Sequence, residues 1–272
     1  RRSGREPMGW RFTPPLHNGG IMTQMRKSFQ LAILLILGLG SMALAQSSGP
    51  LAGQAFGSGN RALVVVLHGD VSKGGPAEYH YDLARKIAHQ NKGVTTLALL
   101  RPGYGDSKGN RSPGSHNNRR DHYTKANNAL VAQTIQNMAK QIGTSKVLVI
   151  GHSGGAAQLG SIIGLYPGLV DSAILVSCPC NIPEWRSRKR RSPWSNSQSP
   201  HDYIGKIARD TRVIVAVGTK DTNTFPDISE DYAAAVKARG LAVGFVPIKG
   251  AGHNFDGLQS TVLRIVQSEL NN

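Results

Sequence analysis

The sequence predicts an α/β protein in which a mostly parallel sheet is covered by helices on both faces. Short apolar runs such as "ALVVVLHG" (62–69) and "GVTTLALL" (93–100) show no polar alternation, which is typical of strands buried on both sides. Between them, "AEYHYDLARKIAHQN" has helical spacing, with Leu83, Ala84 and Ile87 on one face. Strands that alternate with helices of this length favour a parallel sheet between two helical layers.

The same alternation continues towards the C-terminus. Residues 101–118 are rich in Gly, Pro, Ser and Asn and predict a loop, whereas 123–143 predict a long amphipathic helix. A polar stretch with several prolines, 178–205, interrupts the rhythm and is a candidate lid. We expect one domain over 61–272, preceded by a polar, glycine-rich segment over 46–60. The remaining predicted strands are 146–150, 172–177, 211–218 and 241–248, and the remaining predicted helices are 155–165, 227–239 and 256–270.

The N-terminal region predicts export. The segment "MRKSFQLAILLILGLGSMALAQ" combines a basic start, an apolar run and an A-x-A site, which is the layout of a secretory signal peptide over 22–45. The apolar run is short for a bilayer span, so we expect cleavage after Ala45 and a periplasmic or secreted protein without a membrane span. A retained membrane anchor is the alternative. Residues 1–21 lie upstream of the better start methionines and are interpreted as a non-native extension.

Charge and cysteine content narrow the classes of partner. Without residues 1–45 the chain keeps 26 Lys and Arg against 15 Asp and Glu, a net charge of +11. This charge favours anionic surfaces or substrates.

Two cysteines are too few for a disulfide scaffold. Because a bridge between Cys178 and Cys180 would close a very small ring around a proline, we expect these cysteines to be unpaired.

The stretch "VLVIGHSGGAAQLG" (147–160) holds the most specific chemical signal. Ser153 follows a buried strand and precedes a helix of small residues, with Gly151 and Gly155 two residues to either side. This G-x-S-x-G pattern predicts a nucleophile elbow, a sharp turn that exposes the serine hydroxyl beyond the carboxyl end of the strand. It also leaves the N–H of Gly154 at a helix start, where a developing oxyanion can bind it.

A serine nucleophile needs a base, and the base needs an orienting carboxylate. The expected chain order is Ser, acid, His. Asp221 directly follows the strand 211–218, and His253 directly follows the strand 241–248, so we expect both beside Ser153. The competing carboxylates are expected on the next helix, and two further histidines flank the site. These alternatives are Asp227, Asp231, His68 and His152.

The loop "LHGD" after the first buried strand predicts the second oxyanion donor. Gly69 lets the backbone turn sharply, which brings the N–H of Asp70 or Val71 towards the oxygen of a substrate. A plain glycine turn is the alternative interpretation. Because we expect this loop to lie beside the elbow, we favour the interpretation as an oxyanion donor.

Over residues 61–270 the chain resembles the α/β-hydrolase superfamily. It is similar to the branch that includes dienelactone hydrolases and prolyl-oligopeptidase-type peptidases, as a single catalytic domain. The matching pieces are "LHGD", "RPGYGDS", "GHSGG", "SPHDY", "GTKDT" and "GAGH". The resemblance implies Ser153, Asp221 and His253 as a catalytic triad, with backbone donors at Gly154 and near Asp70 and Val71. The elbow carries serine where dienelactone hydrolases carry cysteine.

The candidate lid contains a basic run, "WRSRKRRSPW", between Trp185 and Trp194. Its basic residues are Arg186, Arg188, Lys189, Arg190 and Arg191. A solvated, flexible loop is the simplest interpretation. If the run lies near the site entrance, its charge would attract acidic substrates. A single basic cluster without a nucleic-acid-binding fold is weak support for a nucleic-acid partner, and none is expected.

These observations predict an exported serine hydrolase that cleaves a carboxylic ester or a related acyl bond of a small molecule or short peptide. A single-domain aminopeptidase or acyl-peptidase is the alternative, followed by a non-catalytic binding protein on the same fold. The motifs imply no cofactor and no metal. They leave the oligomeric state open.

Overall fold

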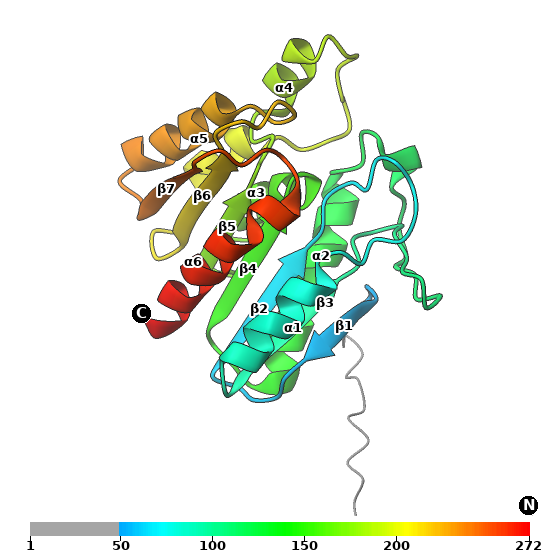
Figure 1. The fold of residues 1–272 in the computed structure, drawn as a ribbon, viewed down its shortest axis with the longest axis vertical. Helices are drawn as coiled ribbons and strands as arrows, with labels where there is room; N and C mark the ends of the chain where they lie inside the picture. Colours follow the sequence, from blue (N-terminus) through cyan, green and yellow to red (C-terminus); the bar gives the residue numbers. More distant parts are fainter. Residues whose placement is uncertain (1–48) are drawn as a thin grey trace, which may run out of the picture. The chain divides into compact units, whose positions relative to one another are not determined.

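The computed structural model describes residues 49–272, so the predicted signal peptide and upstream extension lie outside the described part. The described residues form a seven-stranded sheet in the order β1-β3-β2-β4-β5-β6-β7 (Figure 1). Strand β1 pairs antiparallel with β3, and all other pairs are parallel. The strands are β1 (Gly53–Phe56), β2 (Ala62–Leu67), β3 (Val94–Leu99), β4 (Val147–His152), β5 (Ser172–Val176), β6 (Arg212–Gly218) and β7 (Val243–Ile248).

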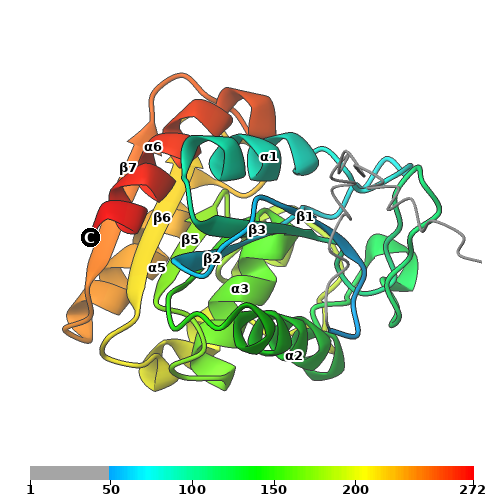
Figure 2. The ribbon, with the colours of Figure 1, turned by 90° about the horizontal axis from the view of Figure 1, so that it is seen from below.

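Helices cover the sheet on both faces, as Figure 2 shows: α1 and α6 lie on one face, and α2, α3 and α5 on the other. The helices are α1 (Tyr81–Gln90), α2 (Lys125–Ile142), α3 (Gly154–Leu165), α4 (Ile182–Arg188), α5 (Pro226–Ala238) and α6 (Gln259–Asn271). Within residues 49–272, none of the helices has both the length and the apolar character needed to cross a bilayer. The predicted α/β class, with a mostly parallel sheet and helices on both faces, is confirmed.

The central strands are buried because both of their faces are apolar. Every residue of β2, β3 and β4 is buried, and their side chains alternate between two apolar cores, one under each helical layer. Helix α2 begins at Thr124, whose side chain accepts the N–H of Asn127, and it ends at Gly143 with φ 70°. Since the central strands are parallel, the loops after β2, β4, β6 and β7 meet at one edge of the sheet.

Two segments contain more regular structure than the sequence predicts. The glycine-rich segment 46–60 holds strand β1, which pairs with β3 in the register Gly53↔Leu99. A Cβ at Gly53 would lie 2.7 Å from the Ala98 carbonyl oxygen, so glycine allows this close pairing. The candidate lid holds α4, which is capped by Asn181 and has Pro183 in its first turn. Both elements are short, so their sequence periodicity is weak.

Candidate active site

Ser153 lies in a strained turn between β4 and α3. Its backbone has φ 53° and ψ −117°, a region that L-residues rarely adopt, and its N–H donates to the Val176 carbonyl at 2.9 Å. A Cβ at Gly151 would lie 2.5 Å from the Gly155 carbonyl oxygen, and one at Gly155 would lie 2.5 Å from the His68 carbonyl oxygen. Side chains at either glycine would therefore prevent the sharp turn.

The structure brings Ser153, His253 and Asp221 together in one hydrogen-bonded chain. His253 Nε2 lies 3.0 Å from Ser153 Oγ, and His253 Nδ1 lies 2.8 Å from Asp221 Oδ2. Asp221 follows β6 and His253 follows β7, so both come from loops at the carboxyl edge of the sheet. The competing Asp227 lies in α5 and forms an ion pair with Arg188. Its carboxylate is therefore engaged away from the histidine.

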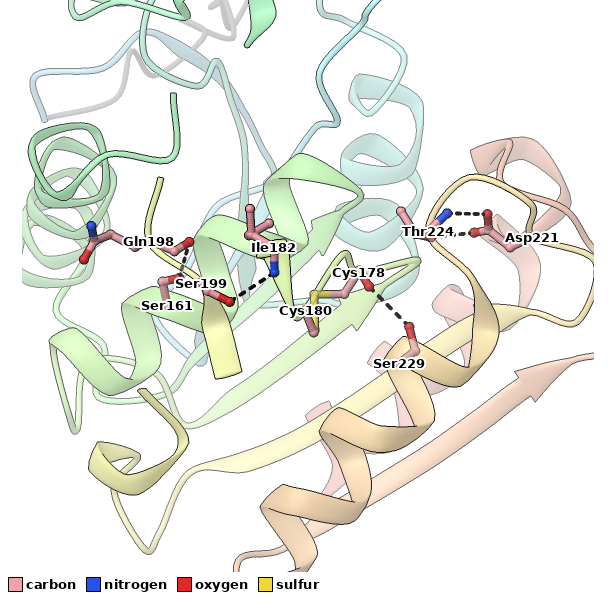
Figure 3. Close-up of a disulfide and its surroundings, with 9 residues drawn as sticks. All are labelled: Ser161, Cys178, Cys180, Ile182, Gln198, Ser199, Asp221, Thr224 and Ser229. Atoms are coloured by element: carbon pink, nitrogen blue, oxygen red, sulfur yellow. Dashed lines mark hydrogen bonds between the residues drawn. A yellow bond between two sulfur atoms is a disulfide. The ribbon is translucent and has the colours of Figure 1, made fainter. Parts of the chain in front are cut away.

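Asp221 is held as a buried carboxylate. It accepts the backbone N–H of Asn223 at 2.8 Å. It also accepts the backbone N–H of Thr224 at 3.0 Å and the Thr224 hydroxyl at 2.8 Å, as Figure 3 shows. Burial alone would raise the pKa of this carboxyl, but the bond to His253 and these N–H groups hold its pKa well below the usual range. Asp221 is thus charged and correctly oriented to stabilise a protonated His253.

Opposite His253, the loop after β2 presents backbone donors. The N–H groups of Asp70, Val71 and Gly154 have no acceptor within residues 49–272. His68 Nδ1 donates to the Gly69 carbonyl at 2.6 Å, and the Tyr104 hydroxyl donates to the Asp70 carbonyl at 2.9 Å. Because a trans peptide is planar, fixing these carbonyls also fixes the N–H of Asp70 and of Val71 on the opposite side.

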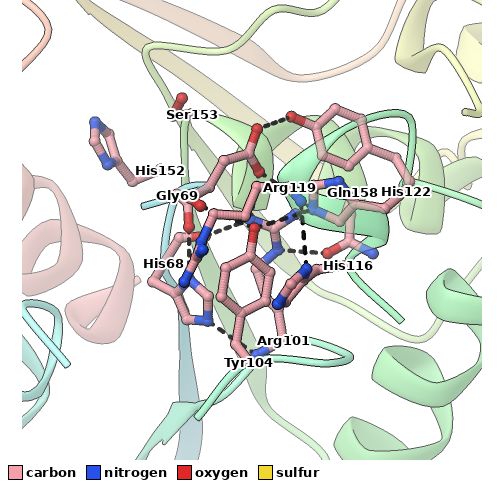
Figure 4. Close-up of polar contacts among 12 residues, drawn as sticks. His68, Gly69, Arg101, Tyr104, His116, Arg119, His122, His152, Ser153 and Gln158 are labelled. Carbon is pink, nitrogen blue, oxygen red and sulfur yellow. Dashed lines mark hydrogen bonds and ion pairs between the residues drawn. The ribbon is translucent and has the colours of Figure 1, made fainter. Parts of the chain in front are cut away.

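Arg101 supports this loop from behind. Its side chain is fully buried, and Nη1 donates to the His68 carbonyl and to Asp70 Oδ1, both at 3.0 Å. Nε donates to Gln158 at 2.6 Å, and Nη2 contacts His122 Nε2 at 3.1 Å (Figure 4). Burial lowers the pKa of His122, while the neighbouring Asp70 carboxylate opposes this shift. The guanidinium also offsets the Asp70 charge beside the free N–H groups.

The Asp70 side chain occupies the space that a side chain at Gly154 would need. A Cβ at Gly154 would overlap Asp70 Oδ1 and would come within 2.7 Å of the Tyr123 hydroxyl, which donates to Asp70 Oδ2 at 2.5 Å. Burial alone would raise the pKa of Asp70, but contacts with His122, Arg101 and Tyr123 hold its pKa well below the usual range. Glycine is therefore needed at position 154 because any larger residue would displace the Asp70 side chain.

Sequence reasoning did not single out Arg101, Tyr104 or His122. Residues 101–118 predict a loop, and a loop arginine is normally exposed to solvent. The available signal was the pair of opposite charges in "LHGD" and "RPGYGDS", each placed directly after a buried strand. Pairing them required the knowledge that β2 and β3 are neighbours in the sheet.

The basic run is largely docked onto the protein. Arg186 is buried, donates to the Ser192 carbonyl at 2.9 Å, and lies over the rings of Trp185 and Trp194. Arg188 is paired with Glu184 and Asp227, and Lys189 donates to the Thr222 carbonyl. Arg190 and Arg191 are exposed. The first part of the run is therefore helical and bonded to the rest of the protein, and the second part is solvated as expected.

Further contacts join this segment to the body of the protein. The Asp121 carboxylate accepts the backbone N–H groups of Asn196 and Ser197, and the Trp185 indole N–H donates to the Asn223 carbonyl at 2.8 Å. Figure 1 shows α4 beyond the upper end of the sheet, beside α5. The candidate lid (178–205), called the wall segment below, thus contacts the loop that carries Asp221.

Cys178 and Cys180 form a disulfide, which corrects the prediction that they are unpaired (Figure 3). Their Cα atoms lie 5.0 Å apart, within the range that a disulfide spans, because the chain bends at Pro179 directly after β5. Both cysteines are fully buried under α5, where the Ser229 hydroxyl donates to the Cys178 carbonyl. The bridge closes the turn at the start of the wall segment.

The chain belongs to the α/β hydrolase family, whose model matches residues 64–205. A search of curated proteins finds no match. Within residues 49–272, no group of three or more His, Cys, Asp or Glu side chains is arranged to hold a metal ion.

Solved structures with this fold include hydrolases of several kinds. Esterase PE8 is 16% identical with a TM-score of 0.60, over 80% of this chain and 98% of that protein. A monoacylglycerol lipase of Paleococcus ferrophilus is 17% identical with a TM-score of 0.57, over 80% and 99%. A puromycin-hydrolyzing peptidase of Mycobacterium tuberculosis is 14% identical with a TM-score of 0.60, over 83% of this chain and 38% of that protein. At these identities the likeness concerns the fold.

Proposed function

We propose that the protein is a serine hydrolase that cleaves a carboxylic ester of a small molecule through an acyl-enzyme intermediate. The observation that carries this proposal is the hydrogen-bonded chain from Ser153 through His253 to Asp221, with the serine held in a strained elbow. A strained backbone persists only where the surrounding structure enforces it, and such positions cluster at active sites. Esterases and a lipase among the solved structures with this fold support the choice of substrate class.

In the reaction, His253 Nε2 takes the proton of the Ser153 hydroxyl as Oγ attacks the carbonyl carbon. The oxygen of that carbonyl becomes negative and accepts the N–H of Gly154 and one or both N–H groups of Asp70 and Val71. Asp221 stabilises the resulting imidazolium. His253 then protonates the leaving alkoxide, and it activates the water that releases the acid from Ser153.

Covalent labelling tests the proposal directly. A fluorophosphonate probe should label the wild-type protein at Ser153 and should leave Ser153→Ala unlabelled, with the modified peptide identified by mass spectrometry. A panel of p-nitrophenyl esters, thioesters, lactones and aminoacyl amides then compares bond types. Folded wild-type protein that neither reacts with the probe nor hydrolyses any member of the panel would contradict the proposal. Hydrolysis of the aminoacyl amides in preference to the esters would favour a peptidase.

The location of the protein is a second part of this proposal. The signal peptide predicted over 22–45 would direct the hydrolase to the periplasm or the medium. N-terminal sequencing of the protein from its native host should begin at Gln46. A mature species that keeps residues 31–39 and sediments with membranes would indicate an anchored enzyme instead.

A further inference from the structure

Beside Ser153, one tyrosine and one histidine connect two loops of the site. The N–H of Gly69 donates to the Tyr79 hydroxyl at 2.5 Å, and this hydroxyl lies 2.6 Å from His152 Nδ1. On the other side of the same ring, His152 Nε2 lies 3.0 Å from the carbonyl oxygen of His253. The bonds therefore run without a gap from the loop after β2 to the loop after β7.

The direction of each bond follows from the groups involved. A peptide N–H can only donate and a carbonyl can only accept. The Tyr79 hydroxyl therefore accepts from Gly69 and donates to His152 Nδ1, while His152 donates its Nε2–H to the His253 carbonyl. This order requires a neutral His152 ring, and burial lowers the pKa of His152 to about 3.

The rings around this chain of bonds are packed together. The His152 ring lies 4.9 Å from Phe255, 5.2 Å from His253 and 5.7 Å from Tyr79, measured between centroids. Tyr79 as a whole residue is 36% exposed, whereas His152 is 7% exposed. Figure 4 shows His152, Ser153 and Gly69 in the same part of the site. A Cβ at Gly69 would lie 3.2 Å from Ser153 Cβ, so the connection passes directly beside the nucleophile.

We propose that Tyr79 and His152 are positioning residues. They hold the loop after β2, which carries the backbone donors, and the loop after β7, which carries His253, at a fixed distance from each other beside Ser153. This inference rests on the proposed function. The Ser153–His253 bond depends on where the His253 backbone lies, and the backbone donors depend on the loop at Gly69. Because small errors of position weaken both proton transfer and oxyanion binding, one device that fixes both loops affects the chemical step more than substrate affinity.

The test compares two hydroxyl deletions. Tyr79→Phe keeps the ring and removes only the oxygen, and we expect about a tenfold fall in kcat for a p-nitrophenyl ester with an unchanged KM. The rate of fluorophosphonate labelling should fall by the same factor. Tyr232→Phe is the matched control, because the Tyr232 hydroxyl on α5 is buried in the apolar core and has no hydrogen-bond partner among residues 49–272. It should keep the wild-type kcat.

A double variant tests whether the two residues act as one unit. We expect Tyr79→Phe combined with His152→Leu to lower kcat no further than the more severe single change, because either change interrupts the same chain of bonds. Additive losses would overturn the proposal. So would a wild-type kcat in Tyr79→Phe, or equal losses in Tyr79→Phe and Tyr232→Phe.

A measurement independent of activity separates this inference from the proposed function. In ¹⁵N NMR spectra the wild-type His152 ring should be neutral at pH 5, with the proton on Nε2, and Tyr79→Phe should shift the Nδ1 resonance. A proton on Nδ1 would overturn the proposed order of bonds. If wild-type Ser153 fails to react with the fluorophosphonate, the proposed function is wrong, and the NMR result still decides whether the connection exists.

Discussion

On one side of Ser153 lies His253, whose side chain is 23% exposed and has one carboxylate partner, Asp221. On the other side the backbone donors rest on Arg101, a fully buried guanidinium with bonds to three side chains and a carbonyl. Both groups of residues serve the same serine, but Arg101 is more deeply buried than His253 and has more hydrogen-bond partners.

The difference follows from what each side does in the proposed reaction. His253 must take up and release a proton in every turnover, which needs an accessible ring with one firm orienting bond. The backbone donors transfer nothing. They stabilise charge only if they already point at the oxyanion, so a buried network that prevents their reorientation increases their effect.

The largest effects are expected on the side that carries out proton transfer. Ser153→Ala and His253→Ala should each lower kcat by about 10⁶, and Asp221→Asn by about 10⁴, because the three groups act as a unit. Asp227→Asn is the control, since this neighbouring acid pairs with Arg188 instead of His253. Steady-state kinetics on a p-nitrophenyl ester measure all four variants. A greater loss of kcat in Asp227→Asn than in Asp221→Asn would show that Asp221 is not the acid that orients His253.

On the buried side, removal of Arg101 should act first on stability. Arg101→Met removes the cationic partner of the half-buried Asp70 carboxylate, together with the bonds to Gln158 and to the His68 carbonyl, and should lower the free energy of unfolding by about 3–5 kcal/mol. Arg188→Gln breaks exposed ion pairs and should cost no more than about 1 kcal/mol. Urea denaturation measures both. Equal losses in the two variants would remove the distinction between the buried and the exposed arginine.

A methyl group at Gly154 tests whether the Asp70 side chain must occupy its observed place. Gly154→Ala should displace Asp70 and lower kcat by about 10²-fold, the scale seen when one oxyanion donor is lost. Gly205→Ala is the control, because no atom lies within 4 Å of a Cβ built there. Kinetics and a thermal melt of each variant separate misplacement from unfolding. Full activity in Gly154→Ala would show that the Asp70 position is irrelevant.

The pH dependence of stability should show two windows. Burial lowers the pKa of His80 and His152 to about 3, so below their unfolded value of about 6.5 only the unfolded chain binds these protons. The free energy of unfolding should therefore fall from pH 6.5 down to about 3, by up to about 1.4 kcal/mol per pH unit for each histidine.

Asp70 and Asp221 act in the second window. Their pKa values are lowered in the folded protein, so their stabilisation is complete above about pH 4 and is lost as the pH falls further. Urea titrations at pH 7.5, 6, 5 and 4 follow the first window, and titrations at pH 3 and 2 follow the second. A stability that stays flat between pH 7 and 5 would contradict the neutral, buried histidines.

The smallest effect is expected at the exposed end of the basic run. Because Arg186 is buried and Arg188 is paired, Arg190→Gln together with Arg191→Gln should raise KM for a carboxylated ester by less than about threefold. A neutral ester of equal size should be unaffected, and the difference should vanish at high salt. A tenfold rise in KM that persists at high salt would indicate direct contact with the substrate.

Local patterns in the sequence were sufficient for the parallel sheet and for the elbow. Apolar runs without alternation mark strands that are buried on both faces, and that property belongs to each segment alone. The positions of Asp221 and His253 followed from one added fact, that the carboxyl ends of parallel strands share an edge. The hydrogen bonds from His253 to Ser153 and to Asp221 agree with those positions.

What only the tertiary structure decided concerns groups whose partners are far along the chain. Arg101 is buried because Asp70, Gln158 and His122 surround it, and these come from three separate segments. The placement of the wall segment depends on bonds to Asp121, and the disulfide depends on a bend after β5. The periodicity of the local sequence indicates neither of them. Burial of a polar group is stable only once its distant partners are in place, so the sequence by itself determined the layers and the reactive loops, and the assembled fold determined the charged network behind them.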